Sequence, residues 1–207
     1  MLTWIKDHFA TLHHLFLTTL VNDDQGNILS LDKGFEYSIR SIKSTCQRSG
    51  KLMFIGNGGS AGIASHLAID YTKNGHMPAM TFTDASALTC LSNDYGYENA
   101  FAKQIEFHGK KEDLLIAISS SGRSLNILNA VTTARKMGCK IITFSGFQEK
   151  NPLRQLGDMN FYVASTEYGF VEIVHAGLGH ALLDYMIEEQ HKKIKTVKKQ
   201  FILEVAE

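Results

Sequence analysis

An apolar run, a glycine-rich turn and a helical pattern follow one another between Leu52 and Asp70 (LMFIGNGGSAGIASHLAID). The apolar run at 52–55 predicts a buried strand, and the turn GNGGS at 56–60 needs the conformational freedom of glycine. A strand, a glycine turn and a helix start direct several free backbone N–H groups at one point, which favours an anion such as phosphate. The segment therefore predicts one unit of a parallel α/β sheet with a phosphate site at its turn.

Strands and helices alternate along the chain from this segment onward. The pattern predicts strands at 52–55, 79–82, 114–118, 140–144 and 159–163, and helices at 59–73, 86–93, 98–107, 124–136 and 170–190. Helices of this length between strands indicate a parallel sheet that is covered on both faces. We expect an α/β fold, a three-layer α-β-α sandwich with a five-stranded parallel sheet, and ligands beyond the carboxyl ends of the strands.

Two helices are expected before the first of these strands. Apolar residues at helical spacing predict an amphipathic helix over 4–21, a turn follows at 22–27, and a second helix is expected over 34–48. We expect residues 1–190 to form a single domain with this N-terminal helical extension. Residues 191–207 contain five lysines and are expected to form a basic tail, either exposed or docked on a partner.

The composition argues against several classes of protein. Lys and Arg together number 21, as do Asp and Glu, so no global charge favours nucleic acid or a membrane surface. The three cysteines have no metal-like spacing and fit reduced thiols. The N-terminus lacks an export pattern, and no segment approaches the roughly 20 uninterrupted apolar residues that span a bilayer. We expect a cytoplasmic protein with neither a nucleic-acid nor a membrane partner.

A second candidate phosphate loop, SSSGRS at 119–124, follows the strand at 114–118 and precedes a helix. Serine hydroxyls donate hydrogen bonds without a formal charge, which suits a phosphate that must also leave. The structural alternative is a serine-rich turn with Ser124 as helix N-cap. Because both strands are expected to end at the same edge of the sheet, the glycine turn and the serine loop support each other as one site.

The helix at 59–73 also carries His66 and Asp70, four residues apart and therefore on one face. Such residues can form an acid–base pair or share a metal ion one or two turns beyond the glycine turn. The alternative is an ordinary helix-surface pair, since polar neighbours at this spacing are frequent.

Several ordered motifs resemble the sugar isomerase (SIS) domain family. They are GNGGSA at 56–61 followed by His66, DAS at 84–86, NDYGY at 93–97 followed by Phe101 and Lys103-Gln104, ISSSGRSLNILNA at 118–130, and VEIVH at 171–175 with His180. Within this family the likeness is strongest to the phosphoheptose isomerases. The resemblance covers residues 35 to 190 and implies the flavodoxin-like SIS fold and an isomerase that interconverts sedoheptulose 7-phosphate and a heptose 7-phosphate.

The resemblance also implies roles for individual residues. The residues that would bind the substrate, with the serines at its phosphate, are Asn57, Gly58, Gly59, Ser60, Asn93, Asp94, Ser119, Ser120, Ser121, Ser124 and Glu172. A zinc ion, one per subunit, would be surrounded by His66, Asp70, Glu172 and His180. In the family's enediol mechanism Asp70 and His180 would be base and acid, and zinc would polarise the carbonyl.

Two positions depart from the family pattern. Asp70 stands where the family has Glu, and a loss of about 1 Å in reach can cost on the order of a hundredfold in rate. Glu172 stands where the family has Gln, and two histidines with two carboxylates remain a sound zinc set. The exchange is compensatory if Glu172 is the catalytic base and Asp70 is only a metal ligand, which we treat as a hypothesis.

Three residues near these motifs also have ordinary structural explanations. Turn chemistry alone would explain Asp94 in its NDYG context. Glu172 would equally serve as a solvated or interface charge. His175 lies about 60° around the helix from Glu172, and we expect it to pack inside the protein rather than act in the site.

The leading expectation is a cytoplasmic isomerase whose product feeds activated heptose for lipopolysaccharide, capsule or another surface polysaccharide. The resemblance implies a homotetramer with active sites at subunit interfaces, which the amphipathic N-terminal helix would suit. An isomerase of another sugar phosphate is one alternative. A second is a non-catalytic SIS scaffold that binds a replication-initiator protein, and a third is a sugar-phosphate-sensing regulator. The retained His66, His180 and two carboxylates weigh against the scaffold.

Overall fold

The computed structural model describes the backbone of residues 1–205 and the side chains of residues 1–192. Its α-helices are α1 (Leu2–Leu17), α2 (Leu31–Gln47), α3 (Gly59–Lys73), α4 (Ala85–Tyr95), α5 (Ala100–His108), α6 (Leu125–Lys136) and α7 (Tyr168–Val205). Its strands are β1 (Leu20–Asp23), β2 (Ile28–Leu29), β3 (Leu52–Gly56), β4 (Ala79–Thr81), β5 (Leu114–Ser119), β6 (Lys140–Ser145) and β7 (Met159–Tyr162). Two short 3₁₀ helices are η1 (Tyr97–Asn99) and η2 (Pro152–Gln155).

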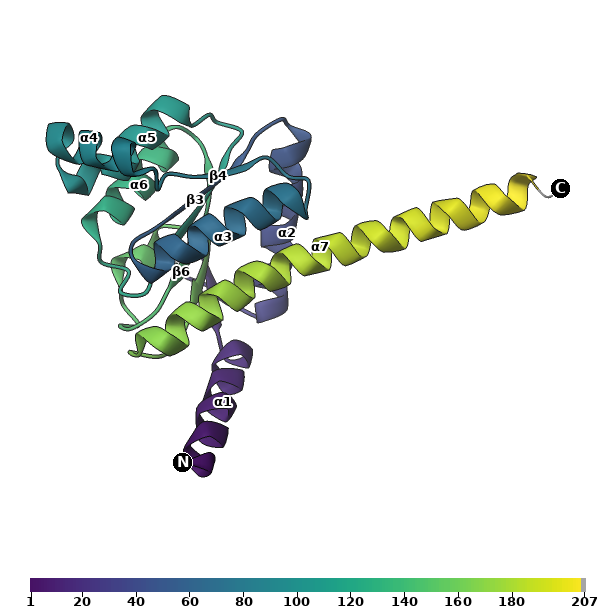
Figure 1. Cartoon of the computed structure of the whole chain (residues 1–207), viewed down its shortest axis with the longest axis horizontal. Helices are drawn as coiled ribbons and strands as arrows, with labels where there is room; N and C mark the ends of the chain where they lie inside the picture. The colour runs from purple at the N-terminus through teal and green to yellow at the C-terminus, as the bar shows by residue number, and fades with distance from the viewer. Residues whose placement is uncertain (206–207) are drawn as a thin grey trace.

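The strands form one sheet in the order β2-β1-β7-β6-β5-β3-β4, with helices around it (Figure 1). The five strands from β3 to β7 pair in parallel and are the five that the sequence predicts. β1 pairs antiparallel with β7, and β2 pairs antiparallel with β1, so the sheet has seven strands instead of the expected five. The predicted α/β class is confirmed, with two added strands at one edge.

The two added strands arise where a helix end and a turn were predicted. α1 ends at Leu17, whereas the apolar spacing indicated a helix to residue 21. Val21 is fully buried under α2, where a Cβ on Gly34 would lie 2.8 Å from a Val21 methyl group. The Asp23 carboxylate accepts backbone N–H groups within the following turn and closes it. Leu20 and Val21 are only two apolar residues, and such a short run fits the helix period and the strand period equally. The apolar pattern alone therefore cannot distinguish a helix end from a strand here.

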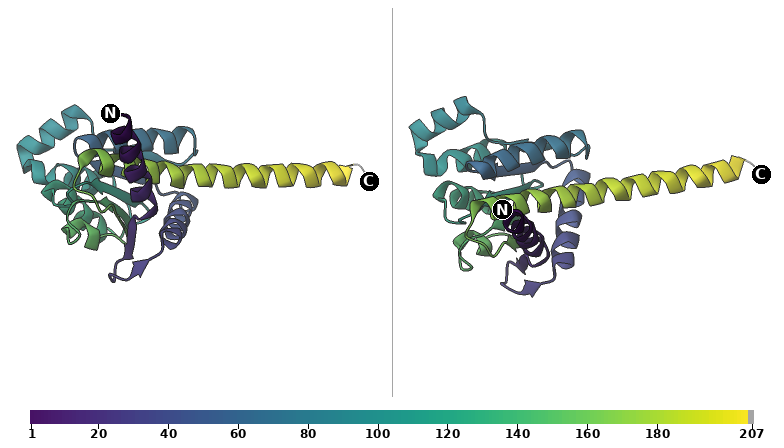
Figure 2. Two further views of the ribbon diagram at one scale, coloured as in Figure 1. Left: turned by 90° about the horizontal axis from the view of Figure 1, so that it is seen from below. Right: turned by 60° about the horizontal axis from the view of Figure 1, so that its bottom comes forward.

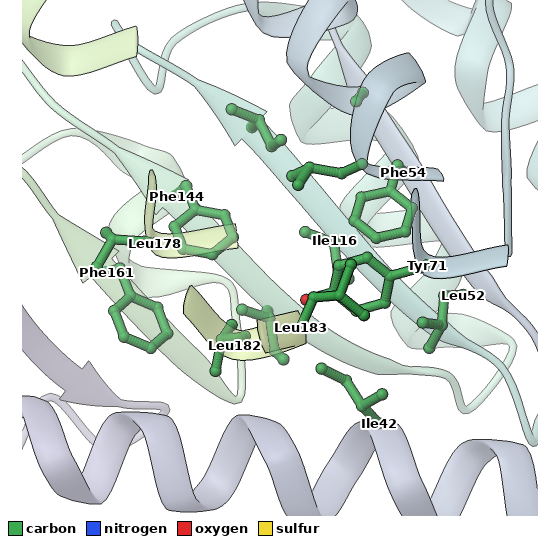
Figure 3. Packing of buried hydrophobic residues seen from close by; sticks show 14 of the residues in the cluster. Ile42, Leu52, Phe54, Tyr71, Ile116, Phe144, Phe161, Leu178, Leu182 and Leu183 are labelled. Atoms are coloured by element: carbon green, nitrogen blue, oxygen red, sulfur yellow. The ribbon is translucent and has the colours of Figure 1, made fainter. Parts of the chain in front are cut away.

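Two apolar clusters, one on each face of the sheet, hold the three layers together. Leu52 and Phe54 of β3 pack in the cluster that includes residues of α2, α3 and α7. Met53 and Ile55 point the other way and pack with residues of α5 and α6, as the alternation of a strand requires. Figure 3 shows the first cluster, in which the Tyr71 ring meets the Phe54 ring edge to face.

The chain leaves β3 and β5, which are neighbours, in opposite directions. β3 connects through α3 to β4, whereas β5 connects through α6 to β6 on its other side. α3 packs on one face of the sheet and α6 on the other. The carboxyl ends of β3 and β5 therefore form a topological switch point, which is where open parallel sheets bind ligands.

Two helices extend beyond the sheet (Figures 1 and 2). α1 contacts α7 through Phe16, which lies beside Gly177, and through His8, whose ring stacks on Phe170. α7 runs past the body of the protein, and its backbone continues the helix to Val205. The predicted basic tail at 191–207 falls on this part, and its side chains beyond Lys192 lie outside the described residues. The domain boundary at residue 190 stays a prediction.

In the part of the chain that the structure describes, α7 over Tyr168–Lys192 is long and apolar enough to cross a membrane by length and composition. However, 50% of the 18-residue apolar window within that stretch is buried in the protein. Its residues Val174, Leu178 and Met186 belong to the apolar cluster on the sheet. These are the properties of a central helix in a globular core.

Candidate active site

The glycine turn connects β3 to α3 at the switch point. A Cβ on Gly56 would lie 2.5 Å from the carbonyl carbon of Ser60, so the turn tolerates no side chain there. Gly58, the N-cap of α3, has a φ of 53°, which residues with side chains rarely adopt. The first N–H groups of a helix have no acceptor within it and lie at the positive end of the helix dipole. The turn therefore places a helix N-terminus at the switch point, as the predicted anion site requires.

The serine loop, defined as residues 119–124, joins β5 to α6 beside the glycine turn. The N–H group of Gly122 donates to the Ser119 carbonyl at 3.1 Å and closes the loop. Ser124 is the N-cap residue of α6, but its side chain makes no capping hydrogen bond. The Ser120 hydroxyl is buried without a hydrogen-bond partner among the described residues. Such a group is costly to leave unpaired, so it points to a ligand that would pair with it.

The two loops enclose a pocket of about 240 Å³. It is lined by Asn57, Gly58, Gly59, Ser60, Ser119, Ser120, Ser121, Ser124, Tyr168 and Glu172. All of these except Tyr168 are predicted substrate-binding residues. Tyr168 is the first residue of α7, and no sequence motif indicated it. The pocket is polar and supplies hydroxyl donors beside two helix N-termini, the chemistry that binds phosphate.

A larger groove of about 940 Å³ lies between α2 and α7. An ion pair between Lys43 and Glu189 links the two helices there, and the groove contains none of the predicted site residues. Size alone therefore does not locate the chemistry, which we assign to the switch point.

Close packing of α3 against α7 brings predicted metal ligands together. A Cβ on Gly179 would lie 2.5 Å from a Leu67 methyl group, so the absence of a side chain lets α3 approach. The Tyr71 hydroxyl of α3 donates to the Gly179 carbonyl at 2.9 Å. His180 is the next residue of α7 and consequently lies over the face of α3 that carries the predicted histidine–aspartate pair.

His66, Asp70 and His180 form a compact group. Asp70 Oδ2 lies 3.3 Å from His66 Nε2 and 3.7 Å from His180 Nδ1. One ligand atom of each side chain lies within 4.8 Å of the other two. Ligands bonded to tetrahedral zinc at about 2.0–2.1 Å stand roughly 3.3 Å apart, so the two distances at Asp70 Oδ2 are close to those between ligands of one ion.

Glu172 lies outside this group in the structure. A Cβ on Gly59 would lie 2.3 Å from Glu172 Oε2, so the carboxylate packs directly against the glycine turn. It lines the polar pocket and precedes His180 on α7 by two helical turns, about 12 Å along the axis. Three of the four predicted metal ligands meet, and the fourth carboxylate faces the sugar-phosphate pocket.

Asn93 and Asp94 lie on α4, apart from the lining of the pocket. The Asn93 amide donates to Asp94 Oδ1 at 2.9 Å, and no residue of α4, which is described throughout, is buried. Within the described chain these two predicted substrate contacts do not reach the pocket.

Asn57 is held by two residues that were not predicted as part of the site. The carboxamides of Asn57 and Asn126 exchange two hydrogen bonds of 2.9 Å each. The Tyr97 hydroxyl donates to Asn57 Oδ1, also at 2.9 Å. Their only sequence signal is that they belong to two of the quoted motifs, SLNILNA and NDYGY. These hydrogen bonds hold the Asn57 side chain, and with it the glycine turn, against α6 and η1.

His175 is fully buried, which confirms that it is a packing residue. Its Nε2 lies 3.1 Å from the Ser145 carbonyl, and its ring packs beside Phe144. Burial lowers the pKa of His175 to about 4, because the charged imidazolium would lose its hydration. The residue is therefore neutral at physiological pH and supports the core beneath α7.

Comparison with known proteins identifies the family. The SIS domain matches residues 29–146, more than half of the chain. The chain belongs to the SIS domain family. The phosphoheptose isomerase of Helicobacter pylori (strain P12) is 37% identical over 161 residues, which cover 75% of this chain and 83% of that protein. That of Aliarcobacter butzleri is 34% identical over 165 residues, covering 77% and 85%.

Solved structures of SIS proteins agree with this assignment. The phosphoheptose isomerase from Neisseria gonorrhoeae has a TM-score of 0.76 at 26% identity and covers 89% of this chain and 98% of its own. The phosphoheptose isomerase from Francisella tularensis has a TM-score of 0.75 at 24% identity, a likeness of fold. Within the SIS family the chain groups with the phosphoheptose isomerases, as the motifs predicted.

Proposed function

We propose that this SIS protein is an aldose–ketose isomerase that converts sedoheptulose 7-phosphate into a glycero-manno-heptose 7-phosphate through an enediol. One observation carries the proposal. A polar pocket beside the buried Ser120 hydroxyl, which has no hydrogen-bond partner in the described part of the chain, shares α3 and α7 with the group formed by His66, Asp70 and His180. The names of its relatives in Helicobacter pylori and Aliarcobacter butzleri support the choice of substrate.

The pocket supplies the phosphate end of the proposed site. The N-termini of α3 and α6 both open onto it, so backbone N–H groups and positive dipole ends face the anion. Serine hydroxyls add donors without adding positive charge, which lets the product phosphate leave. A bound phosphate would give the Ser120 hydroxyl the partner that it lacks among the described residues.

Zinc is the metal that we propose for the group of three. Histidine nitrogens and a carboxylate oxygen are typical zinc ligands, and the distances of 3.3 and 3.7 Å around Asp70 Oδ2 suit one ion. His66, Asp70 and His180 would hold it and leave a position for substrate oxygens. When bound, zinc polarises the substrate carbonyl and stabilises the negative charge that develops on its oxygen.

Two side chains of this protein suit the proton transfers. Isomerisation removes a proton from the carbon beside the carbonyl and returns it to the former carbonyl carbon, while a second proton moves between the two oxygens. The Glu172 carboxylate faces the pocket and serves as the base for the carbon-bound proton. His180, the acid that the family resemblance implies, would exchange the oxygen-bound proton through Nε2, because its Nδ1 faces Asp70 in the metal group.

The proposal includes a cytoplasmic homotetramer with active sites at subunit interfaces. The His66 side chain is 63% exposed, and α4 presents Asn93 and Asp94 on its surface, so a neighbouring copy has access to both regions. In this proposal Asn93 and Asp94 contact the substrate only within the assembled tetramer. The product would feed activated heptose for lipopolysaccharide, capsule or another surface polysaccharide.

The proposed reaction is tested with zinc-loaded protein and sedoheptulose 7-phosphate in D₂O, followed by NMR. We expect an aldose signal to appear and the carbon-bound proton to exchange for deuterium. The matched variant His180→Ala should show neither the aldose signal nor the exchange. If neither aldose nor exchange appears, this substrate is excluded. Five- and six-carbon ketose phosphates run in parallel identify an isomerase of another sugar. A replication-initiator scaffold needs neither the metal group nor the pocket, and it would turn over none of them.

A further inference from the structure

A fully buried asparagine controls the segment that follows β6. Asn151 is 0% exposed and caps η2, where its Oδ1 accepts the Arg154 N–H at 3.1 Å. Its side-chain amide faces the Ser145 hydroxyl and the Gly146 carbonyl, both at 3.2 Å, and the Gln148 carbonyl at 2.9 Å. One side chain therefore sets the path of residues 145–154, which we name the support segment.

The support segment holds the serine loop by two backbone hydrogen bonds. The Gly146 N–H donates to the Ser120 carbonyl at 3.0 Å, and the Leu153 N–H donates to the Gly122 carbonyl at 3.1 Å. Asn151 also touches the loop itself, because a Cβ on Gly122 would lie only 1.9 Å from Asn151 Oδ1. Gly122 has a φ of 61°, so a glycine fits both the backbone and the asparagine beside it.

These contacts decide which side of the serine loop faces the pocket. The carbonyls of Ser120 and Gly122 are bound to the support segment, whereas Ser120 lines the pocket and its buried hydroxyl has no partner among the described residues. If the support segment loosens, those carbonyls are free to turn toward the pocket. Their partial negative charge would then repel a phosphate that the hydroxyls and N–H groups attract.

We infer that Asn151 is a positioning residue for phosphate binding. It lies outside the pocket lining and acts through the support segment and Gly122. The inference rests on the proposed function, since it assigns Asn151 a role only if the pocket takes a phosphate. Asn151 belongs to none of the motifs that carry the family resemblance.

The test compares Asn151→Ser with a matched control, Asn160→Ser. A serine in place of Asn151 remains a good N-cap for η2 but is too short to reach all three acceptors of the amide. Asn160 is also 0% exposed, and its side chain also makes four hydrogen bonds, but it lies at the start of β7, away from the switch point. Both variants lose a buried amide, and only one lies next to the serine loop.

Binding of inorganic phosphate is measured by calorimetry, and KM and kcat are measured with sedoheptulose 7-phosphate. We expect Asn151→Ser to raise the phosphate dissociation constant and KM about tenfold with a smaller change in kcat, and Asn160→Ser to stay within about twofold of wild type. Equal binding by wild type and Asn151→Ser overturns the inference, as does equal weakening by both variants. Absence of phosphate binding by wild type instead overturns the proposed function, and the inference with it.

A second variant approaches the same contact from the loop. Gly122→Ala drives a methyl group against Asn151 Oδ1 and should also weaken phosphate binding. In the double variant Gly122→Ala, Asn151→Ser the shorter serine side chain leaves room, so the combined loss should be smaller than the product of the two single losses. Unchanged phosphate binding by Gly122→Ala overturns the inference even if Asn151→Ser does not fold, and so does a double variant in which the losses multiply.

Discussion

Two carboxylates of the proposed site lie in different surroundings, which suit the different tasks that we propose for them. Asp70 Oδ2 lies between two histidine nitrogens, 3.3 Å from one and 3.7 Å from the other, which is the environment of a metal ligand. The Glu172 carboxylate packs against Gly59 and lines the polar pocket. The position that supplies the base in the family is occupied here by Asp70, which is shorter than Glu. Glu172 is an additional acid and lines the pocket.

Replacement of Glu172 by Gln tests this division of tasks. If Glu172 is the base, Glu172→Gln should lower kcat by about 10²–10⁴-fold and leave the zinc content unchanged, because a general base contributes about that much. Asp70→Asn should lower the zinc content instead. Restoring the family pair in the double variant Asp70→Glu, Glu172→Gln should recover activity. Equal activity of Glu172→Gln and wild type would show that Asp70 serves as the base.

Burial of His175 predicts a pH dependence of stability. Its pKa is about 4 in the folded protein and about 6.5 in an unfolded chain, so below pH 6.5 the unfolded state binds the proton more readily. The contribution of neutral His175 to the free energy of unfolding is complete above pH 6.5. It is lost as the pH falls, and the loss levels off near pH 4. Urea unfolding measures the free energy of unfolding at pH 7 and at pH 4.5. The decrease between these two pH values should be about 2–3 kcal/mol larger in wild type than in His175→Gln. Equal pH dependence in the two proteins would contradict this assignment.

Site residues were predictable where local backbone chemistry requires a particular residue type. Local sequence predicts the glycines at 56, 58 and 59 and the serines of the serine loop, because a tight turn and a helix N-terminus need these residue types. Tyr97, Asn126 and Asn151 contact partners 29 to 69 residues away, and such contacts leave no local pattern. The position of the Glu172 carboxylate likewise depends on how α7 packs on α3.

At the scale of elements, two glycines of the strand–turn–helix unit β3–α3 have opposite effects on its stability. Gly56 is required by contact, since a Cβ would meet the Ser60 backbone at 2.5 Å. Gly62 lies in α3 with an ordinary helical backbone and nothing within 4 Å of a Cβ, so it only adds to the conformational entropy that the chain loses on folding. One glycine shapes the site, and the other weakens the helix.

Alanine at these two positions should therefore change stability in opposite directions. Gly62→Ala should raise the free energy of unfolding by about 0.5–1 kcal/mol, the usual gain at an open helix position. Gly56→Ala should lower it by at least about 2 kcal/mol, because backbone rather than a flexible side chain must move. Thermal unfolding of both variants is the measurement. A Gly56→Ala protein as stable as wild type would contradict the close approach of β3 to α3.

The elements differ in how well a pattern predicts them. The five parallel strands and α3 were predicted to within about a residue or two, because long apolar runs and strong turn signals bound them. The added strands β1 and β2 have four and two residues and were missed, since the pairing of β1 with β7 and of β2 with β1, rather than local period, makes them strands. Helix α7 begins two residues before its predicted start, and its backbone continues to Val205, well past the predicted end at 190.

At the scale of the whole molecule, the fold joins residues far apart in sequence into one site and leaves one apolar surface uncovered. His66 and His180 meet because α3 and α7 lie side by side on one face of the sheet. On α1, Leu12 and Phe16 pack against the core, whereas Ile5 and Phe9 continue the same stripe and remain 37% and 61% exposed. An apolar stripe that is covered only along part of its length favours contact with another protein surface, and a homotetramer supplies one.

The proposed assembly is tested by adding charge to that stripe. The double variant Ile5→Glu, Phe9→Glu should dissociate the tetramer into smaller species, because two carboxylates would be buried without partners at the interface. The control Thr3→Glu, Ala10→Glu adds the same charge to exposed positions on the opposite side of α1 and should remain tetrameric. Sedimentation velocity measures both, and kcat should fall together with the tetramer if the active sites lie between subunits. A monomeric wild type, or equal sedimentation of the two variants, would show that α1 does not form the interface.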